Sequence, residues 1–210
     1  MRHLPVYILI DTSGSMKGEP IESVKVGLTD MIATLRQNAF ALETVCISII
    51  TYNSEVKQIL PLTELEHLQI PDLGVPAGAT LLGKALGMLY ERVGVEVKKG
   101  TPEQKGDWRP LLFILTDGKP SDTFEYKQNI PRIKSLNFAN IVACAAGPKA
   151  KVEPLQQLTD QVFRLEIVDV TSFKKFFEWI TVVTEVGGKS VGTTSTIELP
   201  SPPEEINIVI

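Results

Sequence analysis

The chain has 210 residues, of which 22% are charged and 43% hydrophobic, a balance typical of one globular domain with a sizeable core. Its net charge of −4 excludes the basic surface of most nucleic-acid-binding proteins, so we expect no DNA or RNA partner. No apolar stretch reaches membrane-spanning length, and residues 1–5 leave no room for a signal peptide, which predicts a cytoplasmic protein without membrane insertion.

The first predicted element is a strand that ends in a group of oxygen-bearing side chains. Val6–Ile10 is a continuous apolar run, as in strands buried on both faces, and Asp11–Ser15 follows it directly. Ligands of open α/β sheets gather at the carboxyl ends of strands, and hard oxygen donors suit Mg²⁺, Mn²⁺ or Ca²⁺. Asp11, Ser13 and Ser15 are therefore candidate metal ligands, although the same residue types also serve as helix caps.

The next segment predicts a helix and a hairpin. Apolar residues recur at spacings of three and four over residues 20–35, and Pro20 suits a first helical turn. Thr44–Thr51 is the second predicted strand, and a short turn connects it to Val56–Leu60, which we expect to be an antiparallel edge strand. Thr63–Pro76 has no clean period and is predicted to be a packed loop with at most one helical turn.

Two further segments complete the predicted metal site. A helix is expected to start at Thr80, after a loop of small residues that lets the Thr80 hydroxyl approach an ion. Leu111–Leu115 is a second buried strand, and it leads into Asp117 and the turn-permitting Gly118. The sequence thus predicts one divalent cation, Mg²⁺ with Mn²⁺ or Ca²⁺ as alternatives, bound by Asp11, Ser13, Ser15, Thr80 and Asp117.

The rest of the chain continues to alternate helices and strands. We predict helices over Thr123–Lys134 and Pro154–Leu158, strands over Ala139–Ala146 and Val162–Leu165, and a last helix capped by Ser172. This order predicts an α/β fold with a doubly wound, mainly parallel six-stranded sheet, one antiparallel edge strand and helices on both faces.

The cysteines and histidines are not expected to bind metal. Cys46 and Cys144 each lie within an apolar strand and lack the spacing of a zinc site, so both are predicted to be buried thiols. His3 and His67 are isolated in the sequence and receive no role.

The order of these motifs resembles the metal-ion-dependent adhesion site of von Willebrand factor type A (VWA) domains, the family that includes integrin I domains. The resemblance covers about residues 4–185, so we expect a VWA domain at 1–186 and an extended tail at 187–210. It implies an interaction module in which an Asp or Glu of a partner protein completes the coordination of the metal. It also implies that Ser13, Ser15 and Thr80 bind the metal through their hydroxyl groups. Asp11 and Asp117 often contact the metal through a water molecule in this family.

An enzymatic alternative is a metal-dependent phosphohydrolase of the haloacid-dehalogenase type, which also places Asp residues after two strands. That chemistry needs a second carboxylate two residues after the nucleophile, where this chain has Ser13. No general base or nucleotide-binding loop is recognisable either, so we expect a binding protein and no enzyme.

Four segments are similar to the TerY-type VWA proteins of bacterial tellurite-resistance loci: Asp11–Ile21, Gly106–Leu111, Thr116–Asp122 and Ala145–Lys151. This resemblance implies a cytosolic scaffold in a chemical-stress or phage-defence system. It also implies a protein kinase and a PP2C-like phosphatase as partners.

Three lysines and the C-terminal segment lead to two further expectations about partner binding. Lys119, Lys149 and Lys151 follow strand ends and form either a basic rim that attracts an acidic partner or an ordinary solvated surface. Ile206–Ile210 is a β-prone segment beyond a proline-rich spacer, and we expect it to pair with a sheet edge of this chain or of a partner rather than remain disordered. Phosphorylation within Thr193–Thr196 would be a switch for that docking.

Overall fold

The computed structural model describes residues 2–148, 150–189, 199–203 and 206–208. The elements, in chain order, are β1 (Leu4–Asp11), η1 (Gly14–Met16), α1 (Glu19–Gln37), α2 (Ala39–Thr44), β2 (Val45–Tyr52), β3 (Val56–Glu64), α3 (Leu82–Glu96), β4 (Leu111–Thr116), α4 (Thr123–Ser135), β5 (Asn140–Ala146), α5 (Val152–Gln156), β6 (Gln161–Leu165), α6 (Val170–Lys189) and β7 (Ile206–Ile208). No helix in these ranges has both the length and the apolar character needed to cross a membrane.

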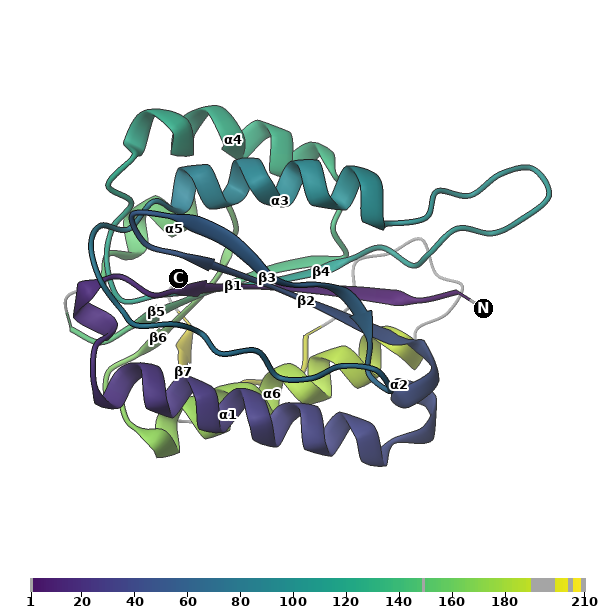
Figure 1. Cartoon of the computed structure of the whole chain (residues 1–210), viewed down its shortest axis with the longest axis horizontal. Helices are drawn as coiled ribbons and strands as arrows, with labels where there is room; N and C mark the ends of the chain where they lie inside the picture. The colour runs from purple at the N-terminus through teal and green to yellow at the C-terminus, as the bar shows by residue number, and fades with distance from the viewer. Residues whose placement is uncertain (1, 149, 190–198, 204–205, 209–210) are drawn as a thin grey trace.

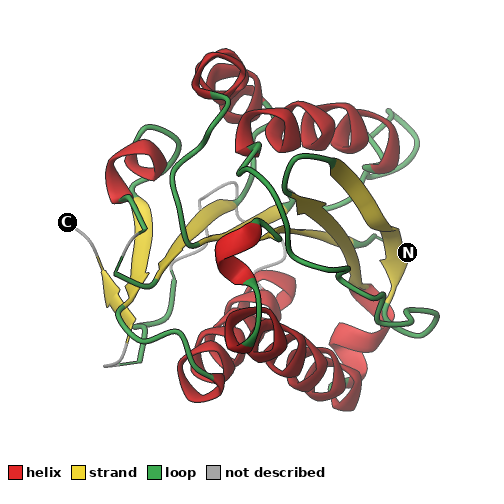
Figure 2. Ribbon diagram, turned by 60° about the vertical axis from the view of Figure 1, so that its left-hand side comes forward, coloured by secondary structure: helices red, strands yellow, loops and turns green. Residues whose placement is uncertain are grey.

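The strands form one sheet in the order β3-β2-β1-β4-β5-β6-β7. Strands β2, β1, β4, β5 and β6 run parallel, and β3 pairs antiparallel with β2 at one edge. This confirms the predicted doubly wound, mainly parallel sheet of six strands with one antiparallel edge strand. The tail adds β7, a seventh strand of three residues, antiparallel to β6 at the other edge (Figure 2).

Helices cover both faces of the sheet, with α1 and α6 on one side and α3 and α4 on the other (Figure 1). The inner strand β1 shows why both faces need a cover, because all of its residues are buried. Its even-numbered apolar residues, such as Ile8, belong to the core beneath α1 and α6. Tyr7 and Leu9 point the other way, into the core beneath α3. Each layer therefore has its own apolar core.

Two glycines allow the helix pairs to pack closely. A Cβ atom on Gly27 of α1 would lie 2.4 Å from the Phe177 ring of α6. A Cβ atom on Gly83 of α3 would lie 2.3 Å from the backbone nitrogen of Tyr126 in α4. Because no real Cβ contact is this short, the absence of a side chain sets the distance within each pair.

The observed elements differ from the prediction in several places, and β3 continues to Glu64, into the predicted loop. The short helix α2 was not predicted, and Asn38 caps it by accepting the Ala41 N–H at 3.1 Å. Ser172 does not cap the last helix, because α6 begins at Val170 and the Asp169 carboxylate accepts the Ser172 N–H at 2.8 Å. The expected domain boundary at residue 186 falls within α6, and the division into domain and tail stays a prediction.

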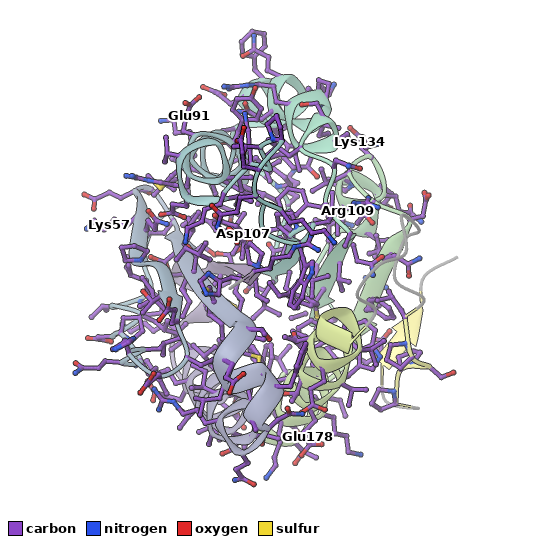
Figure 3. The ribbon with its side chains drawn as sticks, turned by 90° about the vertical axis from the view of Figure 1, so that its right-hand side faces the viewer. Lys57, Glu91, Asp107, Arg109, Lys134 and Glu178 are labelled. Carbon is purple, nitrogen blue, oxygen red and sulfur yellow. The ribbon has the colours of Figure 1, made fainter. Side chains whose placement is uncertain are left out.

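The amino ends of the strands are joined to the loop that enters β4. Asp107 accepts the backbone N–H groups of His3 and Lys98 at 3.1 and 2.9 Å, which ties this loop to the start of β1 and the end of α3. Figure 3 views the molecule from this end, with Asp107 near the centre.

Cys46 and Cys144 are buried free thiols, as predicted.

Candidate metal centre

The predicted ligands lie at the carboxyl ends of two neighbouring parallel strands. Asp11 is the last residue of β1, and Asp117 directly follows β4, which pairs with β1. Two segments that lie more than a hundred residues apart in the sequence thus reach the same edge of the sheet. In Figure 1 this edge is on the left, where the chain leaves β1 and turns through η1.

Asp11 is fully buried and is held in one orientation by both of its oxygens. Its Oδ1 accepts the Ser13 backbone N–H at 2.8 Å, and its Oδ2 accepts the Thr116 hydroxyl at 2.8 Å. Burial raises the pKa of Asp11 to about 6, although the hydrogen bonds from Ser13 and Thr116 partly oppose this shift and the nearby Asp117 adds to it. A buried carboxylate that resists ionisation is a site where a cation would be favoured.

Ser13 and Ser15 connect the two carboxylates. The turn η1 brings their hydroxyl oxygens to 3.2 Å from each other, and the Ser15 hydroxyl donates to Asp117 Oδ1 at 2.9 Å. Ser13 is buried, whereas Ser15 is exposed. The alternate hydroxyls therefore face one small region that is open to solvent on the Ser15 side.

Thr80 borders the same region from the loop before α3. The Thr80 Oγ1 atom lies 3.6 Å from the place where Gly118, next to Asp117, would carry a Cβ. The backbone groups of Thr80 bond to Ser121: its carbonyl accepts the Ser121 N–H at 2.8 Å, and its N–H donates to Ser121 Oγ at 3.3 Å. The structure thus brings Thr80 beside Asp117, while Asp11, Ser13, Ser15 and Asp117 form one hydrogen-bonded chain.

Thr80 does not serve as the cap of α3. The helix begins at Leu82, and the Asp122 carboxylate, from the loop after β4, accepts the N–H groups of Gly83 and Lys84 at 3.0 and 2.7 Å. Because Asp122 satisfies these donors, the Thr80 hydroxyl is available for another role.

Sequence reasoning missed the residues that position the ligands. Thr116 orients Asp11, and Ser54 holds the Thr80 loop by accepting the Ala79 N–H at 3.0 Å. Gly78 in that loop adopts φ +75°, and its carbonyl accepts the Gly14 N–H at 3.2 Å. Only the glycine left a signal in the sequence, because a small-residue loop is visible there and the contacts of Thr116 and Ser54 depend on the fold.

The donor set suits a hard cation. Two carboxylates and three hydroxyls offer only oxygen, the preference of Mg²⁺, Mn²⁺ and Ca²⁺. Within the described residues no cluster of three or more His, Cys, Asp or Glu side chains has the geometry of a metal site. A site here would therefore depend on its hydroxyl groups and would leave the cation short of anionic ligands.

The basic residues expected near the site are only partly described. Lys119 and Lys151 are exposed in the segments that follow β4 and β5, at the same edge as the candidate ligands. Lys149 lies outside the described residues.

These features describe an open α/β domain with a candidate cation site of hydroxyl and carboxylate groups at the carboxyl ends of its strands. The von Willebrand factor type A domain family matches residues 6–179, and the chain belongs to this family. Matrilin-3 from Gallus gallus is 26% identical over 175 residues, which cover 80% of this chain and 38% of matrilin-3.

Similar solved structures agree with the fold. Proximal thread matrix protein 1 from the mussel byssus, in a form described as having a zinc-occupied MIDAS motif, has a TM-score of 0.61 at 16% identity, covering 88% of this chain and 48% of that one. A von Willebrand factor type A protein from Catenulispora acidiphila has a TM-score of 0.59 at 17% identity, covering 88% and 43%. The chain thus spans less than half of each of these relatives.

Proposed function

We propose that the chain is a metal-dependent protein-interaction module that binds an acidic residue of a partner through a divalent cation. The observation that carries this proposal is the convergence of Asp11, Ser13, Ser15 and Asp117 in one hydrogen-bonded chain, with Thr80 beside it. Membership of the von Willebrand factor type A family supports an interaction role over catalysis.

The chemistry of the ligands indicates what a bound ion would do. Asp11 and Asp117 would supply the negative charge, and the hydroxyls of Ser13, Ser15 and Thr80 would supply neutral donors. The ion would keep a strong attraction for one more anionic oxygen, which an Asp or Glu of a partner provides. Mg²⁺ is the proposed ion, with Mn²⁺ or Ca²⁺ as alternatives.

Calorimetric titration with Mg²⁺ and Mn²⁺ tests the site. Asp11→Ala combined with Asp117→Ala should abolish the binding heat and leave the circular dichroism spectrum unchanged. The matched control is Asp160→Asn. Asp160 is exposed and precedes β6 at the amino ends of the strands, away from the candidate ligands, so this variant should bind Mg²⁺ as the wild type does. Undiminished affinity in the double variant would refute the assignment.

The phosphohydrolase alternative gains no support from the geometry. Ser13 occupies the position that would need a second carboxylate, and its hydroxyl contacts Ser15 Oγ at 3.2 Å. We therefore expect no Mg²⁺-dependent release of p-nitrophenol from p-nitrophenyl phosphate. Turnover that disappears in Asp11→Asn would favour the enzyme instead.

We propose further that the module acts in the bacterial cytoplasm, in a tellurite-resistance, chemical-stress or phage-defence system, beside a protein kinase and a PP2C-like phosphatase. The support is the similarity of its four sequence segments to TerY-type proteins. Deleting the gene from its host should lower tolerance to potassium tellurite, and the wild type but not Asp117→Asn should restore it. Recovery of the kinase or phosphatase with the tagged wild type, lost on adding EDTA, would support the partners, and unchanged tellurite tolerance would contradict this placement.

A further inference from the structure

The end of the chain carries a binding contact that the family does not account for. The family match ends at residue 179, so the second half of α6 and everything beyond it lie outside the matched domain. Within the described residues β7 is the strand that covers β6, and without β7 the edge strand would be β6. An uncovered edge presents unpaired N–H and C=O groups, which makes it a template for another strand.

The described residues 199–203 and 206–208, here called the tail segment, contact this edge at two points. Ile206–Ile208 pairs antiparallel with β6, in the register Leu165 to Ile206 and Phe163 to Ile208. At the second point the Trp179 indole N–H donates to the Pro200 carbonyl at 3.0 Å. Figure 2 shows β7 as the outermost strand of the sheet, beside β6.

Trp179 links the two points into one docking surface. Its ring packs against Phe163 of β6 with the ring centres 4.7 Å apart, and the side chain is almost completely buried. Leu199 packs against the same core. The surface thus offers backbone groups along β6, through which sheet edges bind extended peptides, and an indole N–H beside them.

The contacts of the tail segment do not depend on the chain that supplies it. The pairing with β6 and the hydrogen bond from Trp179 of α6 are made by described residues of the tail segment, and the tail segment of a second copy would make the same two contacts. Residues 190–198 connect α6 to the tail segment in the sequence, and a covalent connection raises the local concentration of the cis segment, to the millimolar range for a short linker. A ladder of three residues is short for a strand, which makes exchange accessible.

We propose that the β6 edge with Trp179 is a strand-docking site that accepts the tail segment of a second copy in place of the chain's own, which gives an exchanged dimer. In the intact chain the linker favours the cis form. Shortening the linker should favour the dimer, because α6 carries the chain about 15 Å from Trp179 to Lys189 and one peptide bond spans about 3.8 Å.

The first test deletes residues 190–198, which joins Lys189 to Leu199 and prevents cis docking. Sedimentation velocity should show concentration-dependent dimers or larger oligomers of this variant, whereas the intact chain and a chain truncated after Lys189 stay monomeric. The matched control carries prolines at 206, 207 and 208 in the deletion variant. It has no N–H to donate to β6 and should be monomeric.

The second test measures docking in trans with a synthetic peptide of residues 199–210. The peptide should bind the truncated chain and not the intact one, and the peptide with three prolines should not bind. In a Trp108→Phe background the remaining Trp179 emission should shift to the blue when the peptide binds. If the truncated chain does not fold, the intact chain with prolines at 206, 207 and 208 serves as the acceptor. It keeps its full length, and its own residues 206–208 have no N–H to pair with β6.

Each outcome decides the proposal. Peptide binding together with oligomers of the deletion variant supports it. A peptide that binds neither acceptor overturns the docking site. A deletion variant that stays monomeric while the peptide binds overturns the exchange between copies. Mg²⁺ binding by calorimetry should be the same in all of these variants, so a failure here is separate from a failure of the metal site.

Discussion

At the scale of single residues, Asp11 is a carboxylate whose ionised form is disfavoured by burial. It is completely buried, and burial raises its pKa from the ordinary value of 3.8 to about 6. The folded state therefore binds this proton more tightly than the unfolded state. Ionising Asp11 costs stability progressively from pH 4 to pH 6, and the full cost, about 3 kcal/mol, remains at higher pH. A cation bound beside Asp11 would offset this cost, because it would favour the ionised carboxylate.

The substitution Asp11→Asn should therefore stabilise the metal-free protein above pH 6. Asn can still accept the Ser13 N–H, and its amide can donate to Thr116 Oγ1, so the local bonds survive without the charge. In EDTA, urea unfolding should show a gain of up to about 3 kcal/mol at pH 7.5 and almost none near pH 3.5. With saturating Mg²⁺ the order should reverse, because only the wild type gains binding energy. A variant that is less stable than the wild type in EDTA at pH 7.5 would contradict the account.

At the scale of elements, the contact between α3 and α4 positions the loops that carry Thr80 and Asp122. Gly83 makes this contact close, and any Cβ there meets the backbone of Tyr126 rather than a movable side chain. Gly94, in the same helix, has open space around it. The two glycines therefore have different roles. Gly83 permits the close packing of two helices, whereas Gly94 only weakens the helix, because glycine has a low helix propensity.

Gly83→Ala should destabilise the protein by about 1–3 kcal/mol, because the two helices must separate to admit the methyl group. Gly94→Ala should instead stabilise it by about 0.5–1 kcal/mol through helix propensity. Thermal unfolding measures both, and Mg²⁺ affinity should fall only in Gly83→Ala, since the Thr80 loop moves with α3. Equal effects of the two substitutions would show that the close contact does not matter.

How far the sequence predicts an element depends on whether local or distant residues stabilise it. Periodic helices and apolar strands were predicted because their patterns are local. The candidate ligands were chosen from strand-end motifs and, for Thr80, from a loop before a helix, and their role as ligands stays a prediction. The missed α2 is short, and its cap Asn38 also donates to Glu185 of α6 at 3.0 Å, a contact between residues far apart in the chain. The tail strand was predicted as β-prone, yet only the fold shows that it pairs with β6. Residues that orient ligands, such as Thr116, are not predictable from sequence for the same reason.

At the scale of the whole molecule, the net charge of the protein disfavours an acidic partner, so the local distribution of charge around the site matters. The chain carries −4, and an acidic partner would be repelled at long range. Lys119 and Lys151 lie at the edge of the sheet that carries the candidate ligands. Lys105 and Lys134 are exposed at the opposite end, where Figure 3 shows Lys134 near the top of the molecule. A local positive rim would attract the partner in spite of the net charge.

The double substitution Lys119→Glu and Lys151→Glu should therefore slow association with an acidic partner. The control, Lys105→Glu with Lys134→Glu, has the same net charge and places the change far from the site. With a fluorescein-labelled poly-glutamate peptide in saturating Mg²⁺, stopped-flow rates should fall about tenfold at low salt in the first variant and much less in the control. The difference should vanish at 0.5 M NaCl, where the screening length is only a few ångströms. If both variants slow association equally, the net charge governs the encounter and the two lysines near the site have no special part in it.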